Sequence, residues 1–150
     1  MLQKSSYNAS VTTPINGHLI ITRLFMASGV SCFVISLFSN VFFTPDEDIR
    51  GYWVFITGWL GILFLQFAWY ANPLNLIALL LVNQSPRIAL LLSLLALVLA
   101  SETFLFYEIP TGINQEKMYI QELGSGFFIW YLAQILFLVS ILLSKINRPF

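Results

Sequence analysis

The segment IALLLSLLALVLASETFLF, residues 88–106, sets the environment of this chain. A helix that crosses a bilayer needs about 20 mostly apolar residues, and this segment contains a single ionisable side chain, that of Glu102. Three further apolar blocks of similar length precede and follow it, and together the four blocks occupy most of the 150 residues. The sequence therefore predicts that the chain lies in a membrane, with lipid as its main partner.

The composition leads to the same conclusion. Hydrophobic residues make up 58% of the chain and charged residues 9%, whereas about a quarter of the residues in a soluble domain are charged. A water-soluble fold with four such segments would have too little polar surface to face water. The formal net charge is zero and the seven basic residues are scattered, so no nucleic-acid partner is expected.

Helix starts are predicted where a capping side chain precedes a proline, as in Thr44-Pro45, Asn72-Pro73 and Ser85-Pro86. Thr44 is followed by Glu47, which also fits a capping box. The second helix would then begin at Pro45. The predicted spans are about 18–43, 50–70, 86–107 and 119–145.

The apolar stretch 73–82 is too short to span a bilayer, so we predict a short re-entrant or interfacial helix between the second and third spans. The alternative is that the second helix continues through 73–82 as one kinked rod over 40 Å long, by a rise of ~1.5 Å per residue. Asn72, Pro73 and Asn75 in succession favour the break.

Aromatic pairs flank the predicted second span, Tyr52-Trp53 at its start and Trp69-Tyr70 at its end. At ~1.5 Å per residue the pairs are roughly 25 Å apart, which is close to the spacing of the two aromatic belts of a membrane protein. The fold expected from all these signals is an all-α, integral membrane four-helix bundle. We expect residues 1–17 to form a polar, flexible tail, 18–145 a single transmembrane domain, and 146–150 a C-terminal tail.

Small residues mark where membrane helices can approach closely. They occur in every predicted span except the third, which is mostly leucine and is therefore expected to face lipid or to fill gaps by bulk. The patches are Ala27, Ser28, Gly29 and Ser31, then Gly58 and Gly61, then Gly124, Ser125 and Gly126.

Orientation follows from the basic residues. With four crossings, one side carries Lys4, Arg23, Arg87, Lys145 and Arg148, and the other side carries only Arg50 and Lys117. The positive-inside rule then places both termini in the cytoplasm.

Ionisable or amide side chains at membrane depth are costly and are the natural candidates for function. Glu102 is either a proton- or cation-responsive carboxylate, or a structural group that reaches the surface or pairs with Arg50, Lys117 or Asn40. Arg23 is expected to snorkel to the inner headgroups, and a salt bridge between Arg23 and Glu102 would contradict the predicted orientation.

Three amide side chains complete the set of polar candidates, namely Gln66, Gln134 and Asn72. We expect Gln66 and Gln134 to bond to each other, or to Asn72 or Asn75, and so to hold the helices together, with a substrate contact as the alternative.

Catalytic, cofactor-binding and metal-binding residues are not predicted. His18 is the only histidine and Cys32 the only cysteine, and the chain has no nucleophile elbow and no glycine-rich phosphate loop. The sequence thus predicts a protein that is not an enzyme and holds no cofactor.

The stretch Phe67 to Pro73, following Gly58 to Gly61, resembles small uncharacterised four-helix proteins of bacterial inner membranes. The resemblance implies a bacterial cytoplasmic membrane and carries no function. Three classes stay open: a non-catalytic accessory protein that binds another membrane protein, a small oligomeric transporter or channel, and a protective protein of the bacteriocin-immunity kind.

Overall fold

The computed structural model describes residues 17–110 and 117–146, which are mostly helical. Three helical segments are long and apolar enough to cross a membrane, Gly17–Phe38, Pro86–Leu105 and Ser125–Lys145. They correspond to helix α1 (Gly17–Phe38), helix α4 (Pro86–Ser101) with its 3₁₀ extension η3 (Glu102–Leu105), and helix α5 (Ser125–Ile146). These segments confirm that the chain has apolar helices long enough to cross a membrane, although the first and last helices are shorter than expected.

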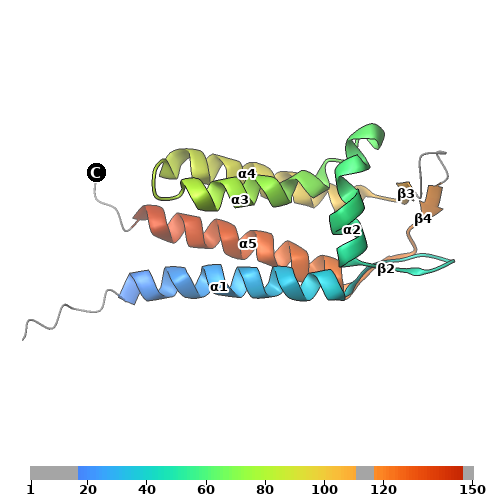
Figure 1. The fold of residues 1–150 in the computed structure, drawn as a ribbon, viewed down its shortest axis with the longest axis horizontal. Helices are drawn as coiled ribbons and strands as arrows, with labels where there is room; N and C mark the ends of the chain where they lie inside the picture. Colours follow the sequence, from blue (N-terminus) through green and yellow to red (C-terminus); the bar gives the residue numbers. More distant parts are fainter. Residues whose placement is uncertain (1–16, 111–116, 147–150) are drawn as a thin grey trace, which may run out of the picture.

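The long helices lie lengthwise beside one another. Helix α1 packs against α5, and helix α3 (Ala71–Leu81) forms a hairpin with α4 that packs against α5 (Figure 1). The first turn of α1, the turn between α3 and α4, and the last turn of α5 lie at one end, which we call the terminal end (Figure 1). We call the opposite end, which carries the strands, the β end. Both described chain ends therefore lie at the same end of the molecule.

Short strands occupy the β end, which corrects the all-α prediction. Strands β1 (Asn40–Phe43), β2 (Asp48–Arg50) and β5 (Glu122–Leu123) form a sheet in the order β2-β1-β5, and β3 (Glu108–Pro110) pairs antiparallel with β4 (Lys117–Tyr119). The helices expected at 18–43 and 119–145 consequently end at Phe38 and begin at Ser125. The β-branched and aromatic residues of Asn40–Phe43 favour a strand once a partner strand is available.

Thr44 does make the capping bond that its sequence predicts, but in a hairpin. Its Oγ1 accepts a hydrogen bond from the Glu47 amide at 3.2 Å and donates one to the Glu47 carbonyl at 2.6 Å. These bonds close the loop between β1 and β2, so no helix begins at Pro45. A threonine that bonds to the residue three positions later occurs both in turns and at helix starts, and here the pairing of β1 with β2 favours the turn.

The break in the second apolar block falls earlier than predicted. Helix α2 (Gly51–Thr57) and the 3₁₀ segment η1 (Gly58–Phe64) cross the β end, and the chain then turns at 65–67 into η2 (Ala68–Tyr70) and α3 (Figure 1). Pro73 lies in the first turn of α3, where its missing amide costs nothing, so it does not break the helix. The short segment that crosses the end of the bundle is therefore α2 with η1, before the turn at 65–67. Residues 73–82 instead belong to the helical hairpin of α3 and α4, which runs along the length of the molecule.

The two aromatic pairs lie at the same end of the molecule, which corrects their prediction as opposite belts. The Trp69 Nε1 donates to the Phe55 carbonyl at 2.9 Å, and the Tyr70 hydroxyl donates to the Trp59 carbonyl at 3.0 Å. These bonds fold the segment η2 back against α2 and η1. Because the chain reverses between the pairs, their separation along the sequence does not measure membrane thickness.

Small residues hold the lengthwise helices together. On α4 the fully buried residues are Ala89, Ser93, Ala96 and Ala100, spaced so that they share one face. This stripe was not expected of the leucine-rich helix. Gly29 of α1 is buried against α5, and a Cβ there would come within 2.8 Å of the Phe137 ring, which explains the glycine.

Candidate functional site

Five polar side chains from three helices meet between α3, α4 and α5, and we call them the amide cluster: Asn72, Asn75, Ser93, Trp130 and Gln134. Asn75 Nδ2 donates to Gln134 Oε1 at 2.5 Å, and the Ser93 hydroxyl donates to Asn75 Oδ1 at 2.7 Å. The Trp130 indole donates to Asn72 Oδ1 at 2.8 Å, and Gln134 Nε2 donates to the same oxygen at 3.5 Å.

Helical spacing brings these side chains together. Asn72 and Asn75 are three residues apart on α3, and Trp130 and Gln134 are four apart on α5, so each pair shares one face of its helix. Ser93 comes from the small-residue face of α4. Gln134 lies about 14 Å along α5 from Ser125 at a rise of ~1.5 Å per residue, which places the cluster inside the apolar part of the molecule.

The cluster is closed. Asn75, Ser93 and Gln134 are all less than 3% exposed, and every buried side-chain nitrogen or oxygen in the described residues has a hydrogen-bond partner. The prediction that Gln134 bonds to Asn72 and Asn75 is confirmed. Gln66 is not part of the cluster, because its Nε2 donates to the Glu108 carbonyl at 2.9 Å.

Ser93 is the member that sequence reasoning missed. A single serine at the centre of a leucine-rich helix was available as a signal, since a hydroxyl at that depth needs a partner. Its partner is on a different helix, 18 residues earlier in the chain. The pairing therefore could not be read from the spacing of polar residues along one helix.

Glu102 has a backbone partner. It is half-buried at the junction of α4 and η3, and its Oε2 accepts a hydrogen bond from the Phe67 amide at 2.7 Å. None of its three expected partners bonds to it: Asn40 donates to Asp48 at 3.0 Å, Lys117 pairs with Glu108 at 2.6 Å, and Arg50 makes no ion pair within the described residues. The carboxylate thus holds the turn that precedes η2.

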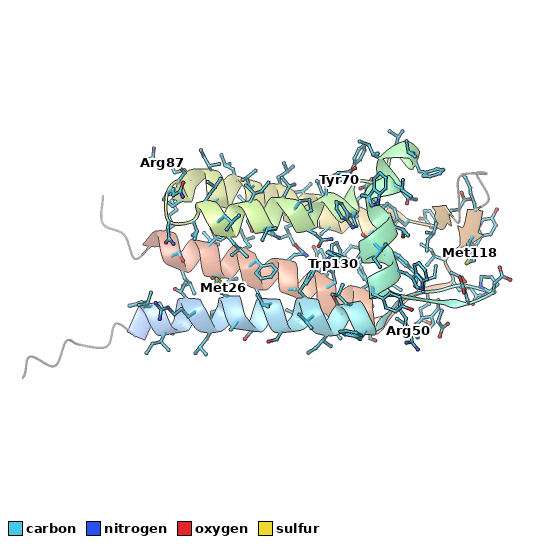
Figure 2. All side chains as sticks on the ribbon, in the orientation of Figure 1. Met26, Arg50, Tyr70, Arg87, Met118 and Trp130 are labelled. Carbon is cyan, nitrogen blue, oxygen red and sulfur yellow. The ribbon has the colours of Figure 1, made fainter. Side chains whose placement is uncertain are left out.

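Arg23 lies in the second turn of α1 and is exposed near the terminal end, whereas Glu102 lies toward the β end of α4. No salt bridge joins the two among residues 17–110 and 117–146. Figure 2 labels Arg87 at the terminal end and Arg50 at the β end, on the sides to which the basic-residue count assigned them.

Two cavities adjoin the amide cluster. The larger, of about 800 Å³, lies at the β end beneath α2 and η1, and we call it the β-end cavity. The smaller, of about 380 Å³, lies between α1, α3 and α5, and we call it the lateral cavity. Asn72 lines both. Both volumes fall within the ~300–1,000 Å³ typical of small-molecule sites.

Metal-ligating side chains do not gather in the described part of the chain, where no group of three or more His, Cys, Asp or Glu residues could hold an ion.

Comparison with known proteins does not identify the protein: no protein-family model, curated protein or solved structure matches this chain. Any functional conclusion therefore depends on the chain's own residues.

Proposed function

We propose that this protein is a non-catalytic accessory protein of a bacterial inner membrane that acts by binding another membrane protein. In this proposal α1, α3, α4 and α5 cross the bilayer as a four-helix bundle with both termini in the cytoplasm. Helix α3 together with η2 spans Ala68–Leu81, about 21 Å at ~1.5 Å per residue, which is shorter than the ~30 Å hydrocarbon layer. Local thinning of the bilayer would accommodate this short crossing.

The observation that carries the proposal is the uncovered face of α1. Only Gly29 and Ser36 are buried among its residues, and α1 packs along its length on α5 and beside α2 at the β end. Ala27, Ser28 and Ser31 are exposed, and neither serine hydroxyl has a hydrogen bond within the described residues. Small residues with free hydroxyls on a membrane helix favour close approach of a second helix.

The closed amide cluster supports a non-catalytic role. Catalysis in a membrane would need an ionisable or nucleophilic group aimed at a reacting atom. The carboxylate of Glu102 and the buried amides of Asn75 and Gln134 are all engaged in bonds that join segments of the chain itself. These groups stabilise the bundle and leave α1 as the surface available to a partner.

Charge supports the orientation. The terminal end carries three basic residues, Arg23, Arg87 and Lys145. The β end carries two basic residues, Arg50 and Lys117, and five acidic ones, Asp46, Glu47, Asp48, Glu108 and Glu122. An excess of basic residues at the terminal end favours its placement in the cytoplasm.

Photo-crosslinking in the native membrane tests the partner. A photoreactive amino acid at Ser31 should give one discrete adduct, whereas the same residue at Leu91, an exposed position on α4, should not. The adduct should be lost when Ala27 is replaced by leucine, because the added bulk keeps a second helix at a distance. Equal labelling at Ser31 and Leu91, or an adduct insensitive to Ala27→Leu, would contradict the proposal.

A second function, as a small transporter, is favoured by the β-end cavity. It extends from the strands to Asn72 and Trp130 and so reaches the amide cluster from one side. Solute flux in reconstituted vesicles that is abolished by filling the cavity, for example by Leu60→Trp, would support transport. Flux equal to that of protein-free vesicles would exclude it.

A further inference from the structure

Three aromatic rings lie where the two cavities adjoin. Phe33 of α1 packs edge-to-face on Phe55 of α2, with ring centroids 5.8 Å apart, and Phe55 packs on Trp69 of η2 at 6.4 Å. All three rings line both cavities. The rings thus join α1, α2 and η2 at the junction of an apolar cavity and a partly charged one, and one ligand in contact with all three rings can extend into both cavities.

The lateral cavity fits an alkyl chain. None of its lining side chains is ionisable, and the amides of Asn72, Asn75 and Gln134 that border it are bonded to one another. Along η2 and α3 it extends from Trp69 to Leu79, which is roughly 15 Å at ~1.5 Å per residue. This length is about half of the ~30 Å hydrocarbon layer, so it matches one leaflet.

A helix would not fit the same space. A helical segment 15 Å long and ~10 Å wide would need roughly 1,200 Å³, about three times the cavity's volume. The lateral cavity holds about 380 Å³. An acyl chain is therefore the better occupant, and the partner helix proposed above would bind the exposed face of α1 instead.

The β-end cavity carries charges of both signs at its rim. Glu47, Asp48 and Arg50 line it, all three are exposed, and they lie within four residues of one another around β2. Asp48 bonds to Asn40, whereas the Arg50 guanidinium forms no ion pair in the described ranges. Phe55, the middle of the three rings, is five residues after Arg50, about 8 Å along α2.

We propose that the two cavities together hold one zwitterionic, amine-bearing phospholipid of the leaflet at the β end. One acyl chain lies in the lateral cavity, the phosphate lies beside Arg50, and the ammonium group lies beside Glu47. The proposal rests on the membrane embedding but not on the partner of α1. It is tested on the purified protein alone, so its failure is distinguishable from failure of the crosslinking experiment.

The test uses the full chain in detergent and a phosphatidylethanolamine with a diazirine in one acyl chain. Photolabelling measured by mass spectrometry should saturate at one lipid per chain, and unlabelled phosphatidylethanolamine should compete. The labelled residues should include Leu76 and Leu79, which line the lateral cavity. Labelling that rises without saturation, or that follows surface exposure alone, would overturn the proposal.

Two tryptophan variants of α3 make a matched pair. Leu76 lines the lateral cavity and is 61% exposed, whereas Leu80 is 67% exposed and does not line it. Leu76→Trp should lower labelling about tenfold by filling the cavity, and Leu80→Trp should change it less than about twofold. Equal effects of the two variants would remove the lateral cavity as the binding site.

Headgroup variants test the charged rim. Arg50→Gln should lower labelling several-fold, whereas Arg23→Gln, at the terminal end, should leave it unchanged. Glu47→Gln should abolish the preference for phosphatidylethanolamine over phosphatidylglycerol, because only the former carries an ammonium group. The Glu47 side chain makes no bond in the hairpin loop, whose bonds use its backbone, so the fold is retained. Equal labelling by both lipids with the unmodified protein would refute the headgroup assignment.

Discussion

Asn75 is the residue on which the interior of this protein depends most, because its side chain joins three helices. Its nitrogen donates to Gln134 and its oxygen accepts from Ser93, so a single amide links α3, α5 and α4. Both the nitrogen and the oxygen of this amide are therefore bonded to neighbouring helices of the chain itself. The residue is thus better suited to fixing how the helices pack than to binding a substrate.

Replacing Asn75 by alanine should lower the free energy of unfolding by about 1–2 kcal/mol, because Gln134 and Ser93 lose their partners in an apolar interior. Unfolding by a denaturing detergent in mixed micelles, followed by circular dichroism, measures the change. Gln84→Ala, in the exposed turn between α3 and α4, is the control and should change stability by less than about 0.5 kcal/mol. An Asn75→Ala variant as stable as the control would show that the amide cluster is energetically neutral.

Glu102 acts through the hydrogen bond to the Phe67 amide, which needs an acceptor oxygen but not a charge. Glu102→Gln keeps such an oxygen and should change stability by less than about 0.5 kcal/mol, whereas Glu102→Ala should cost about 1–2 kcal/mol. The same unfolding assay at several pH values measures both. Equal losses for the two variants would mean that the carboxylate charge, and not its acceptor, is what the fold requires.

At the scale of elements, the turn that follows α2 and η1 begins with one strained residue. Leu65 has φ 57°, the left-handed region that leucine rarely adopts, and its side chain is exposed. The Leu65 amide donates to the Ile62 carbonyl, and the next amide, that of Gln66, donates to the Gly61 carbonyl at 2.9 Å. This left-handed residue ends η1 and directs the chain into the lengthwise hairpin.

Leu65→Gly should stabilise the protein by about 1 kcal/mol, since glycine adopts the left-handed conformation without the cost that leucine bears. Leu63→Gly is the control: Leu63 is equally exposed but lies within η1, where glycine should be destabilising. Detergent unfolding of both variants provides the comparison. Destabilisation by Leu65→Gly as large as that by Leu63→Gly would contradict the left-handed turn.

The hairpin of β3 and β4 is joined by an ion pair at the β end. Lys117 Nζ lies 2.6 Å from Glu108 Oε2, and this hydrogen bond together with the negative charge of Glu108 raises the pKa of Lys117 above its ordinary value of 10.5. A raised pKa in the folded state means that the pair stabilises the hairpin fully below pH 10.5. That contribution is lost as the pH rises through the folded-state value.

Glu108→Gln should therefore return the pKa of Lys117 toward 10.5, because the largest causes of the shift both come from Glu108. An NMR titration of the lysine side chains measures this, with Lys145 at the terminal end as the internal control. A Lys117 pKa unchanged by the substitution would show that the ion pair is not formed in solution. Because the pair is largely exposed, salt should weaken it.

At the scale of the whole molecule, the terminal end and the β end should lie on opposite sides of the membrane. Cys32 is the only cysteine, so Cys32→Ala gives a background free of thiols. In intact cells a membrane-impermeant maleimide should label Glu47→Cys, in the β1–β2 loop, but not Gln84→Cys, in the α3–α4 turn, until the cells are opened. Labelling of both from outside, or the reverse order, would refute the proposed topology.

The sequence by itself determined that the apolar segments within 18–43, 86–107 and 119–145 contain helices long enough to cross a membrane, and it determined the chemistry of the buried amides. These properties depend on length, apolar content and the cost of an unpaired polar group in hydrocarbon, all of which are local. The start of α4 at Ser85-Pro86 was also readable, because the fixed φ of proline acts on its own residue.

Only the tertiary structure decided where the second apolar block breaks, which ends become strands, and which amides meet. Thr44 closes a hairpin loop because β1 pairs with β2 and β5. Pro73 lies in the first turn of α3, without interrupting it, because the chain has already turned at Leu65. Gln134 and Asn75 are 59 residues apart and Phe67 and Glu102 are 35 apart. Such contacts arise from the packing of whole elements against one another, and no periodicity within a single segment encodes them.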